Sequence, residues 1–329
     1  MHRNNTDNTD TLTPGSVASL AHAFADTLGP ALRAVLFQRR SAATAANWSN
    51  LPQGYLGSRG RAGLRTSTLD QAQWAALDLL LAAATGAGRG QGFDAIGLHL
   101  AADDHLAAHG AGPHYGRGNF FVAFLGEPSD DGTWQLQFGG HHLAVSNSYH
   151  RGALTGATPS FRGIEPFAHS PAEDPASTAM GRKYAAMTGL VKSLDPAQRR
   201  LARPAGSWPD ILLGPGGDGM FPSRAQGIAG RGLSPAQRDM LMAAIGEWVH
   251  DVDDVGAERI LTTYAGQLDR TYLAHSGTTA LDRPGDYVRI DGPRAWIEFS
   301  MHDGIVLADP HPHTVWRDRL TDYGGPGIH

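Results

Sequence analysis

The segment Asp309–Asp318 near the C-terminus, which reads Asp-Pro-His-Pro-His-Thr-Val-Trp-Arg-Asp, most limits what this chain can fold into. Pro310 and Pro312 each fix their own φ and push the preceding residue out of the α-helical region. The segment therefore predicts an extended strand. Side chains two residues apart leave the same face of a strand, so His311 and His313 present two imidazoles side by side. Two such rings make half of a metal site, and the other half must come from elsewhere.

The best candidate for the other half is the paired histidine in Gly139–Leu143, which reads Gly-Gly-His-His-Leu. Residues 120–125 and 134–138 before it have the patterns of two strands of a hairpin. The apolar residues are even-numbered before the glycines and odd-numbered after them. A β-bulge at the glycines would explain this change and place His141 beside Leu143, whereas without a bulge His142 lies on the side of Phe138. Which histidine faces the site stays open.

Three capping patterns mark helix starts in the chain. In each, a capping residue is followed three positions later by glutamine, and in two of them proline occupies the first helical position. The pairs are Thr68 and Gln71, Asp195 and Gln198, and Ser234 and Gln237. The recurrence marks helix starts and does not by itself establish a repeat fold.

The remaining patterns predict an α+β protein, with a mainly antiparallel sheet flanked by helices in a single large domain over residues 15–329. Helical periodicity covers residues 16–39, broken at Gly29-Pro30, and residues 68–84, 235–250 and 255–268. Strands are expected at 271–275, 287–290 and 295–299, and a strand with a turn at 149–158. Residues 158–166 are expected to form an ordered loop, and residues 214–232 a glycine-rich loop or lid. Residues 86–92 are glycine-rich but lack the Gly-Lys-Ser/Thr of a phosphate loop.

Composition excludes several function classes. The chain of 329 residues has no cysteine, which excludes disulfides, thiolate metal ligands and a cysteine nucleophile. The net charge of −5, without a basic stripe, disfavours a nucleic acid or an anionic membrane as partner. Residues 1–14 are polar and are expected to be disordered. No apolar run approaches the roughly 18 residues of a membrane span, so we expect a cytoplasmic protein.

A plausible metal-ligand set is His311, His313 and either His141 or His142, with Glu298 as a further ligand or an open position in its place. Three imidazoles are compatible with catalytic zinc and also with copper, iron or nickel. Glu298 lies in an otherwise apolar strand, where a carboxylate requires a partner or a cation. Arg317 and Asp318 are candidates for groups that orient the ligands, and His302 is a weaker addition.

Two readings without a metal compete with this one. The histidines can form a polar network that acts by general acid and base catalysis, or a hydrogen-bonded core. Arg65 and Glu165 are candidates for substrate binding, Arg65 through a carboxylate of the substrate, although a solvated loop arginine is the simpler interpretation of Arg65. No Gly-x-Ser-x-Gly and no His-Glu-x-x-His occurs, which argues against serine hydrolases and zincin proteases.

From about residue 45 onward the chain resembles the family catalogued as domain of unknown function 3500. The resemblance implies one functional unit that uses both histidine motifs, and the family name carries no activity. The segments that carry it are Trp48–Pro52, Trp134–Leu143, Pro159–Pro166, Trp296–Glu298, His311–Asp318 and Asp322–Gly324.

We therefore expect a metal-dependent enzyme, with oxidation of a small organic or peptidic substrate ranked above zinc-type hydrolysis or a lyase reaction at the same site. Copper or iron is the favoured ion and zinc the alternative. Glu298, Arg317 and Asp318 are the expected catalytic residues. The competing class is a non-catalytic protein that binds a metal or a small ligand. The sequence does not indicate an oligomeric state.

Overall fold

The computed structural model describes residues 15–56, 60–167, 178–304 and 306–326. Residues 1–14, for which we expect disorder, lie outside this part. The helical pattern that follows is divided as Gly29-Pro30 predicts, into α1 (Val17–Asp26) and α2 (Pro30–Leu36), and the chain continues into the short strand β1 (Phe37–Gln38). Pro30 occupies the first helical position of α2, where its missing N–H costs no hydrogen bond.

Two stretches of the chain contain a similar succession of elements, a two-residue strand, two helices and four strands, and the first has one more strand, β6 (Ala153–Gly156), before its last. In the first stretch these are β2 (Leu64–Arg65), α4 (Gln71–Ala84), α5 (Gly92–Leu106), β3 (Phe121–Leu125), β4 (Thr133–Gly140), β5 (Leu143–His150) and β7 (Ser160–Gly163). In the second they are β8 (Ile228–Ala229), α8 (Pro235–Val249), α9 (Asp254–Ala265), β9 (Tyr272–Ser276), β10 (Tyr287–Asp291), β11 (Ala295–His302) and β12 (His311–Asp318). Further elements are α3 (Ala42–Ala45), β6 (Ala153–Gly156), α6 (Gly181–Ser193) and α7 (Pro196–Ala202).

All of these strands join one sheet, in the order β1-β3-β4-β5-β7-β12-β11-β10-β9-β8, with β2 paired to β3 and β6 to β5. The pairing is antiparallel except between β1 and β3. The last strands of the two stretches, β7 and β12, pair antiparallel at the centre. Equal stretches joined in this way are related by an approximate two-fold rotation through the middle of the sheet. The α+β class is confirmed, and the structure adds an internal duplication that the capping patterns alone did not establish.

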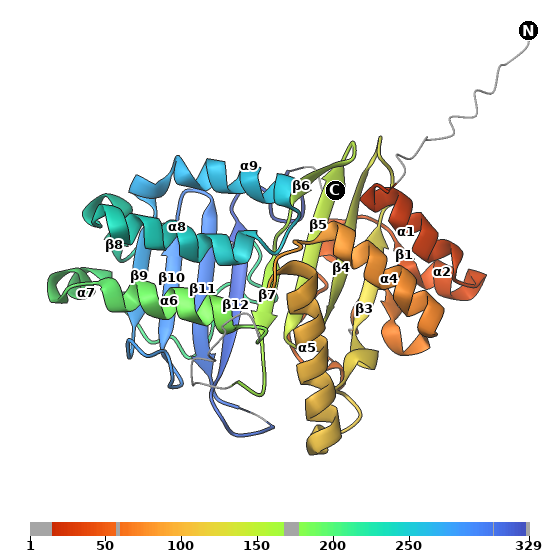
Figure 1. Ribbon diagram of the computed structural model, residues 1–329, viewed down its shortest axis with the longest axis horizontal. Coiled ribbons are helices and arrows are strands. Elements are labelled where there is room, and N and C mark those ends of the chain that lie inside the picture. Colours follow the sequence, from red (N-terminus) through yellow and green to blue (C-terminus); the bar gives the residue numbers. More distant parts are fainter. Residues whose placement is uncertain (1–14, 57–59, 168–177, 305, 327–329) are drawn as a thin grey trace, which may run out of the picture.

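The two faces of the sheet differ in what covers them. In Figure 1, α4, α5, α6, α8 and α9 lie over one face, and apolar side chains such as Phe138, Ile297 and Trp316 belong to the large core of the protein. Polar side chains occupy the opposite face, including Gln137 and Glu298, both buried. Residues 39–56 and 60–63 cover this face in the first half and residues 203–227 in the second. We call it the loop-covered face.

Two of the three expected helix caps are confirmed and one is shifted. Asp195 and Ser234 form capping boxes with the glutamines three residues later. The first cap is Asp70 with Gln73, because Thr68 ends a 3-10 turn and its hydroxyl donates to the carbonyl of Arg65. The equivalent segments Leu64–Gln73 and Ile228–Gln237 thus have the same strand, turn and cap at the same spacing.

The expectation of a loop at residues 158–166 is wrong for its central part. Residues 160–163 form β7, which pairs with β5 on one side and with β12 on the other. Four residues are too few for a strand pattern to show in the sequence. Because β7 is inserted between β5 and β12, it brings the first histidine motif to the side of the second.

Candidate metal centre

His141 and His142 form the two-residue turn of the hairpin between β4 and β5. Gly140 pairs with Leu143, and His142, the second residue of the turn, has a φ of 59°, in the left-handed region that tight turns often use. A two-residue turn pairs Phe138 with Val145, so these two residues lie on the same face of the sheet. The change of the apolar positions from even to odd numbers therefore follows from the turn itself. The bulge considered at the glycines is therefore wrong, and both histidines project from the end of the hairpin.

The strand expected at the second motif is confirmed as β12, which carries His311 and His313 on the loop-covered face. His313 lies opposite Gly163 of β7. A Cβ atom at Gly163 would lie 3.1 Å from ring carbons of both His142 and His313, which is closer than ordinary van der Waals contact. The absence of a side chain at Gly163 thus allows the rings of the two motifs to approach each other.

Three imidazoles converge at this point. The Nε2 atom of His313 lies 3.1 Å from Nε2 of His311 and 3.2 Å from Nε2 of His142. The ligand nitrogens of the three residues all lie within 4.8 Å of one another, and all three side chains are buried. A metal with bonds of about 2.0–2.1 Å and angles between octahedral and tetrahedral requires roughly 2.9–3.4 Å between ligand nitrogens. The three rings can therefore hold a metal ion.

The environment keeps the rings of His142 and His311 neutral. Burial, together with the charges of neighbouring histidines, lowers the pKa of His311 to about 3 and holds the pKa of His142 well below its ordinary value. Neutral imidazole is the form that binds metals, since its unprotonated nitrogen has a lone pair to donate. The chemistry of the donor set therefore fits a metal at neutral pH.

Two aspartates orient rings of the cluster. Asp210, in the 203–227 segment, lies 3.0 Å from Nδ1 of His313, and Asp103 of α5 lies 2.6 Å from Nδ1 of His141. A carboxylate on Nδ1 fixes the tautomer that leaves Nε2 free for a ligand. Burial would raise the pKa of Asp210, but the hydrogen bond and charge of His313 outweigh it and hold this pKa below the ordinary value.

His141 and His302 lie beside the triad and are not part of it. The ring of His141 stacks on that of His142 with centroids 3.7 Å apart, and the ring of Tyr115 meets His141 edge-on at 5.0 Å. His302 stacks on His313 with centroids 4.8 Å apart. Of the two histidines left open by the sequence, His142 is the one whose ligand nitrogen joins the group.

The expected catalytic residues of β11 and β12 form hydrogen bonds with protein groups other than the three histidines. Both oxygens of the Glu298 carboxylate accept hydrogen bonds, from Tyr287, Trp296 and the backbone of 212–213. Arg317 donates to backbone carbonyls and to two aspartates of its surroundings. Asp318 accepts from Tyr264, Arg294 and the backbone of the next turn. Their proposed roles at the metal remain predictions.

The expected substrate-binding residues lie in two different places. Arg65 is exposed on β2 and donates to the Gly118 carbonyl and to the Asn119 side chain. Glu165 is buried, with its carboxylate accepting from the backbone N–H groups of Val306 and Leu307. Neither belongs to the three-histidine group.

The duplication relates the triad to a second place in the sheet. Leu143 pairs with Arg162 in the first half, and Ala295 pairs with Asp318 in the second. When these two pairs are superposed, the His141-His142 turn corresponds to Pro293-Arg294. The same correspondence matches His311 and His313 to Thr155 and Ala157. Arg294 and Thr155 line a pocket of about 270 Å³. The histidines thus occupy one of two positions related by the duplication. At the second position the corresponding residues are Arg294, Thr155 and Ala157, and none of these three has a side chain typical of metal ligands.

The contact between Asp210 and His313 leads to a prediction. Replacing Asp210 by asparagine should weaken metal binding by about 10–100-fold, because the amide no longer holds the ring as a carboxylate does. Competition with a chelator of known affinity measures this change. Asp309→Asn is the matched control, since Asp309 is exposed and lies two residues from His311. An unchanged affinity in Asp210→Asn would show that Asp210 does not orient a ligand.

The fold and the site define a duplicated α+β protein with a candidate three-histidine metal centre. The chain belongs to the family described as "Protein of unknown function (DUF3500)", whose model matches residues 12–325. The family resemblance of the sequence is thereby confirmed. No curated protein and no solved structure matches the chain. Among the described helices, none combines the length and the apolar character that crossing a membrane requires.

Proposed function

We propose that this protein is a metal-dependent enzyme whose ion is held by His142, His311 and His313. The convergence of the three Nε2 atoms is the observation that carries the proposal. In this arrangement a bound cation would accept a lone pair from each of the three Nε2 atoms. Three protein ligands leave at least one coordination position for water or substrate, as in catalytic rather than structural sites.

For the reaction, we propose oxidation of a small organic or peptidic substrate. An all-imidazole set without thiolate suits copper and iron, which supply redox chemistry when bound. Hydrolysis at zinc also calls for a group that accepts a proton near the ion. The carboxylates in contact with the cluster, Asp103 and Asp210, are each hydrogen-bonded to a ring nitrogen. This arrangement favours oxidation over hydrolysis.

Metal analysis of the purified protein tests both parts of the proposal. We expect about one copper or iron ion per chain, removable with a chelator and restored by adding the metal. Electron paramagnetic resonance should then show nitrogen ligation. One zinc ion per chain would contradict the proposed oxidation and would instead support a hydrolase or lyase reaction at the same site. A protein that neither contains nor takes up a transition metal would leave no basis for a metalloenzyme.

A further inference from the structure

Arg289 is a buried cation without a carboxylate partner in the described part of the chain. It lies on β10, its side chain is 0% exposed, and Nε, Nη1 and Nη2 make no well-formed hydrogen bond to a described residue. A polar neighbour is the hydroxyl of Tyr287, which already donates to Glu298. Removing a guanidinium from water is costly unless an acceptor replaces the water. Buried polar groups left without a partner in a native structure usually mark a site for an ion, a water molecule or a ligand.

Neither of two carboxylates close to Arg289 in the sheet is hydrogen-bonded to it. Glu298 lies directly opposite Arg289 on the neighbouring strand, but both of its oxygens accept hydrogen bonds from other donors. Asp291, two residues further along β10, pairs through Oδ1 with Arg319 at 2.8 Å, and its Oδ2 atom has no hydrogen-bond partner among the described residues. The charge of Arg289 therefore has no counter-ion among its strand neighbours.

Two indole rings enclose the guanidinium. Its central carbon lies 5.1 Å from the ring of Trp208 and 5.0 Å from the ring of Trp296. Trp208 belongs to the 203–227 segment and also stacks on Tyr287, with centroids 4.8 Å apart. The same segment brings Asp210 to His313. One covering segment thus closes over both Arg289 and the candidate metal centre.

An unpartnered hydroxyl lies between the two places. Ser300 of β11 pairs with Tyr287 on one side and with His313 on the other, so all three side chains leave the loop-covered face in one row. The Oγ atom of Ser300 is buried and has no hydrogen-bond partner among the described residues. From strand spacings, the Cα atom of Arg289 lies about 12 Å from that of His313. Both side chains can therefore reach one small molecule.

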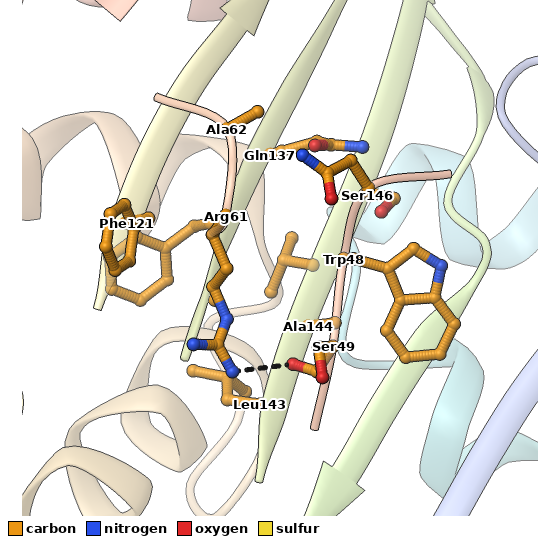
Figure 2. A pocket seen from close by; sticks show the side chains of 13 residues that line it. Trp48, Ser49, Arg61, Ala62, Phe121, Gln137, Leu143, Ala144 and Ser146 are labelled. Carbon is orange, nitrogen blue, oxygen red and sulfur yellow. Dashed lines mark hydrogen bonds between the residues drawn. The ribbon is translucent and has the colours of Figure 1, made fainter. Parts of the chain in front are cut away.

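The duplicated half shows what this position looks like without the cation. Gln137 corresponds to Arg289, and its neutral amide donates a hydrogen bond to the carbonyl of Ala45. Gln137 and Ser146 line a small pocket beneath Trp48, Ser49 and Arg61 (Figure 2). The equivalent location in the first half is thus a recess between the sheet and its covering segment, with a neutral amide where the second half has a guanidinium.

We propose that Arg289 binds the carboxylate of the small substrate on which the candidate metal centre acts. The proposal rests on the proposed function and names its substrate class. A guanidinium offers parallel N–H groups that match a carboxylate in geometry and charge. The two indole rings restrict the space beside it to a flat group. Ser300 then donates a hydrogen bond to the part of the substrate between Arg289 and the metal.

The test uses metal-free full-length protein, so that binding at the ion does not contribute, and sodium acetate as the probe. Calorimetric titration at fixed ionic strength should show saturable acetate binding by the wild type. In Arg289→Gln, which installs the residue of the duplicated half, we expect at least tenfold weaker binding. Arg319→Gln is the matched control, because Arg319 also lies over Trp296 but already has a carboxylate partner, and its affinity should stay within twofold.

Three outcomes would overturn the carboxylate site: unchanged acetate binding in Arg289→Gln, an equal response to sodium chloride, or no acetate binding by the wild type. Arg289→Lys keeps the charge without the paired N–H groups and provides a second measurement if Arg289→Gln fails to fold, with intermediate affinity expected. Metal uptake is measured on the same metal-free preparations after copper or iron is added back. Acetate binding without metal uptake would reject the metalloenzyme and keep the site, whereas metal uptake without acetate binding would reject the site alone.

Discussion

Replacing His311 and His313 together by alanine is expected to reduce bound metal from about one ion per chain to none. The two changes remove two of three converging ligands, and a single remaining imidazole does not retain a transition metal against a chelator. The far-ultraviolet circular dichroism spectrum should remain close to that of the wild type, because the backbone pairing of β12 with β7 and β11 does not depend on either side chain. Metal analysis after gel filtration gives the result directly.

His302→Ala is the matched control for this experiment. His302 stacks on His313 but contributes no ligand atom to the group, so the variant should retain its metal. Full metal occupancy in the double variant would contradict the proposed ligand set. Equal loss in His302→Ala and in the double variant would show that metal binding depends on the general packing of the rings and not on three defined ligands.

The sequence predicted the two motifs that supply the triad because each motif is encoded locally, and it left open which of His141 and His142 takes part. The spacing of His311 and His313 between prolines predicts a strand and a common face, and both features are present in β12. The pairing of this strand with the first motif is not encoded locally. It depends on β7, whose four residues are completely buried between two other strands and whose sequence does not show a strand pattern.

The aspartates of the site could not be predicted. Asp103 lies on α5 and Asp210 in an irregular segment, far along the chain from the histidines that they contact. An aspartate on a helix or in a loop is ordinary in sequence, and only tertiary structure shows which ones meet a ring. The duplication was similarly hidden, because β2 and β8 each have two residues and only the capping boxes after them recur visibly in the sequence.

Asp251→Asn is expected to destabilise the protein by about 3–5 kcal/mol, the usual cost of leaving a buried charge uncompensated. Asp251 lies between two buried cations, with Lys183 at 3.1 Å and Nε of Arg162 at 3.3 Å. It also accepts from the backbone of Gly92 and thereby joins α8 to the start of α5. An asparagine would leave both cations without a carboxylate. The free energy of unfolding in urea measures the loss.

The pH dependence of this loss follows from the pKa of Asp251. Burial would raise that pKa, but Lys183 and Arg162 outweigh burial and hold it below the ordinary value. A carboxyl group whose folded pKa is lowered stabilises the protein above its unfolded pKa of about 4, and this contribution is lost as the pH falls further. The difference in the free energy of unfolding between wild type and Asp251→Asn should therefore be full at pH 7 and narrow towards pH 3.

Asp239→Asn is the matched control, because Asp239 is an exposed position on α8, and it should change stability by less than about 0.5 kcal/mol. Similar losses in the two variants would show that the buried charges do not need Asp251, and the junction of the two halves would then rest on apolar packing.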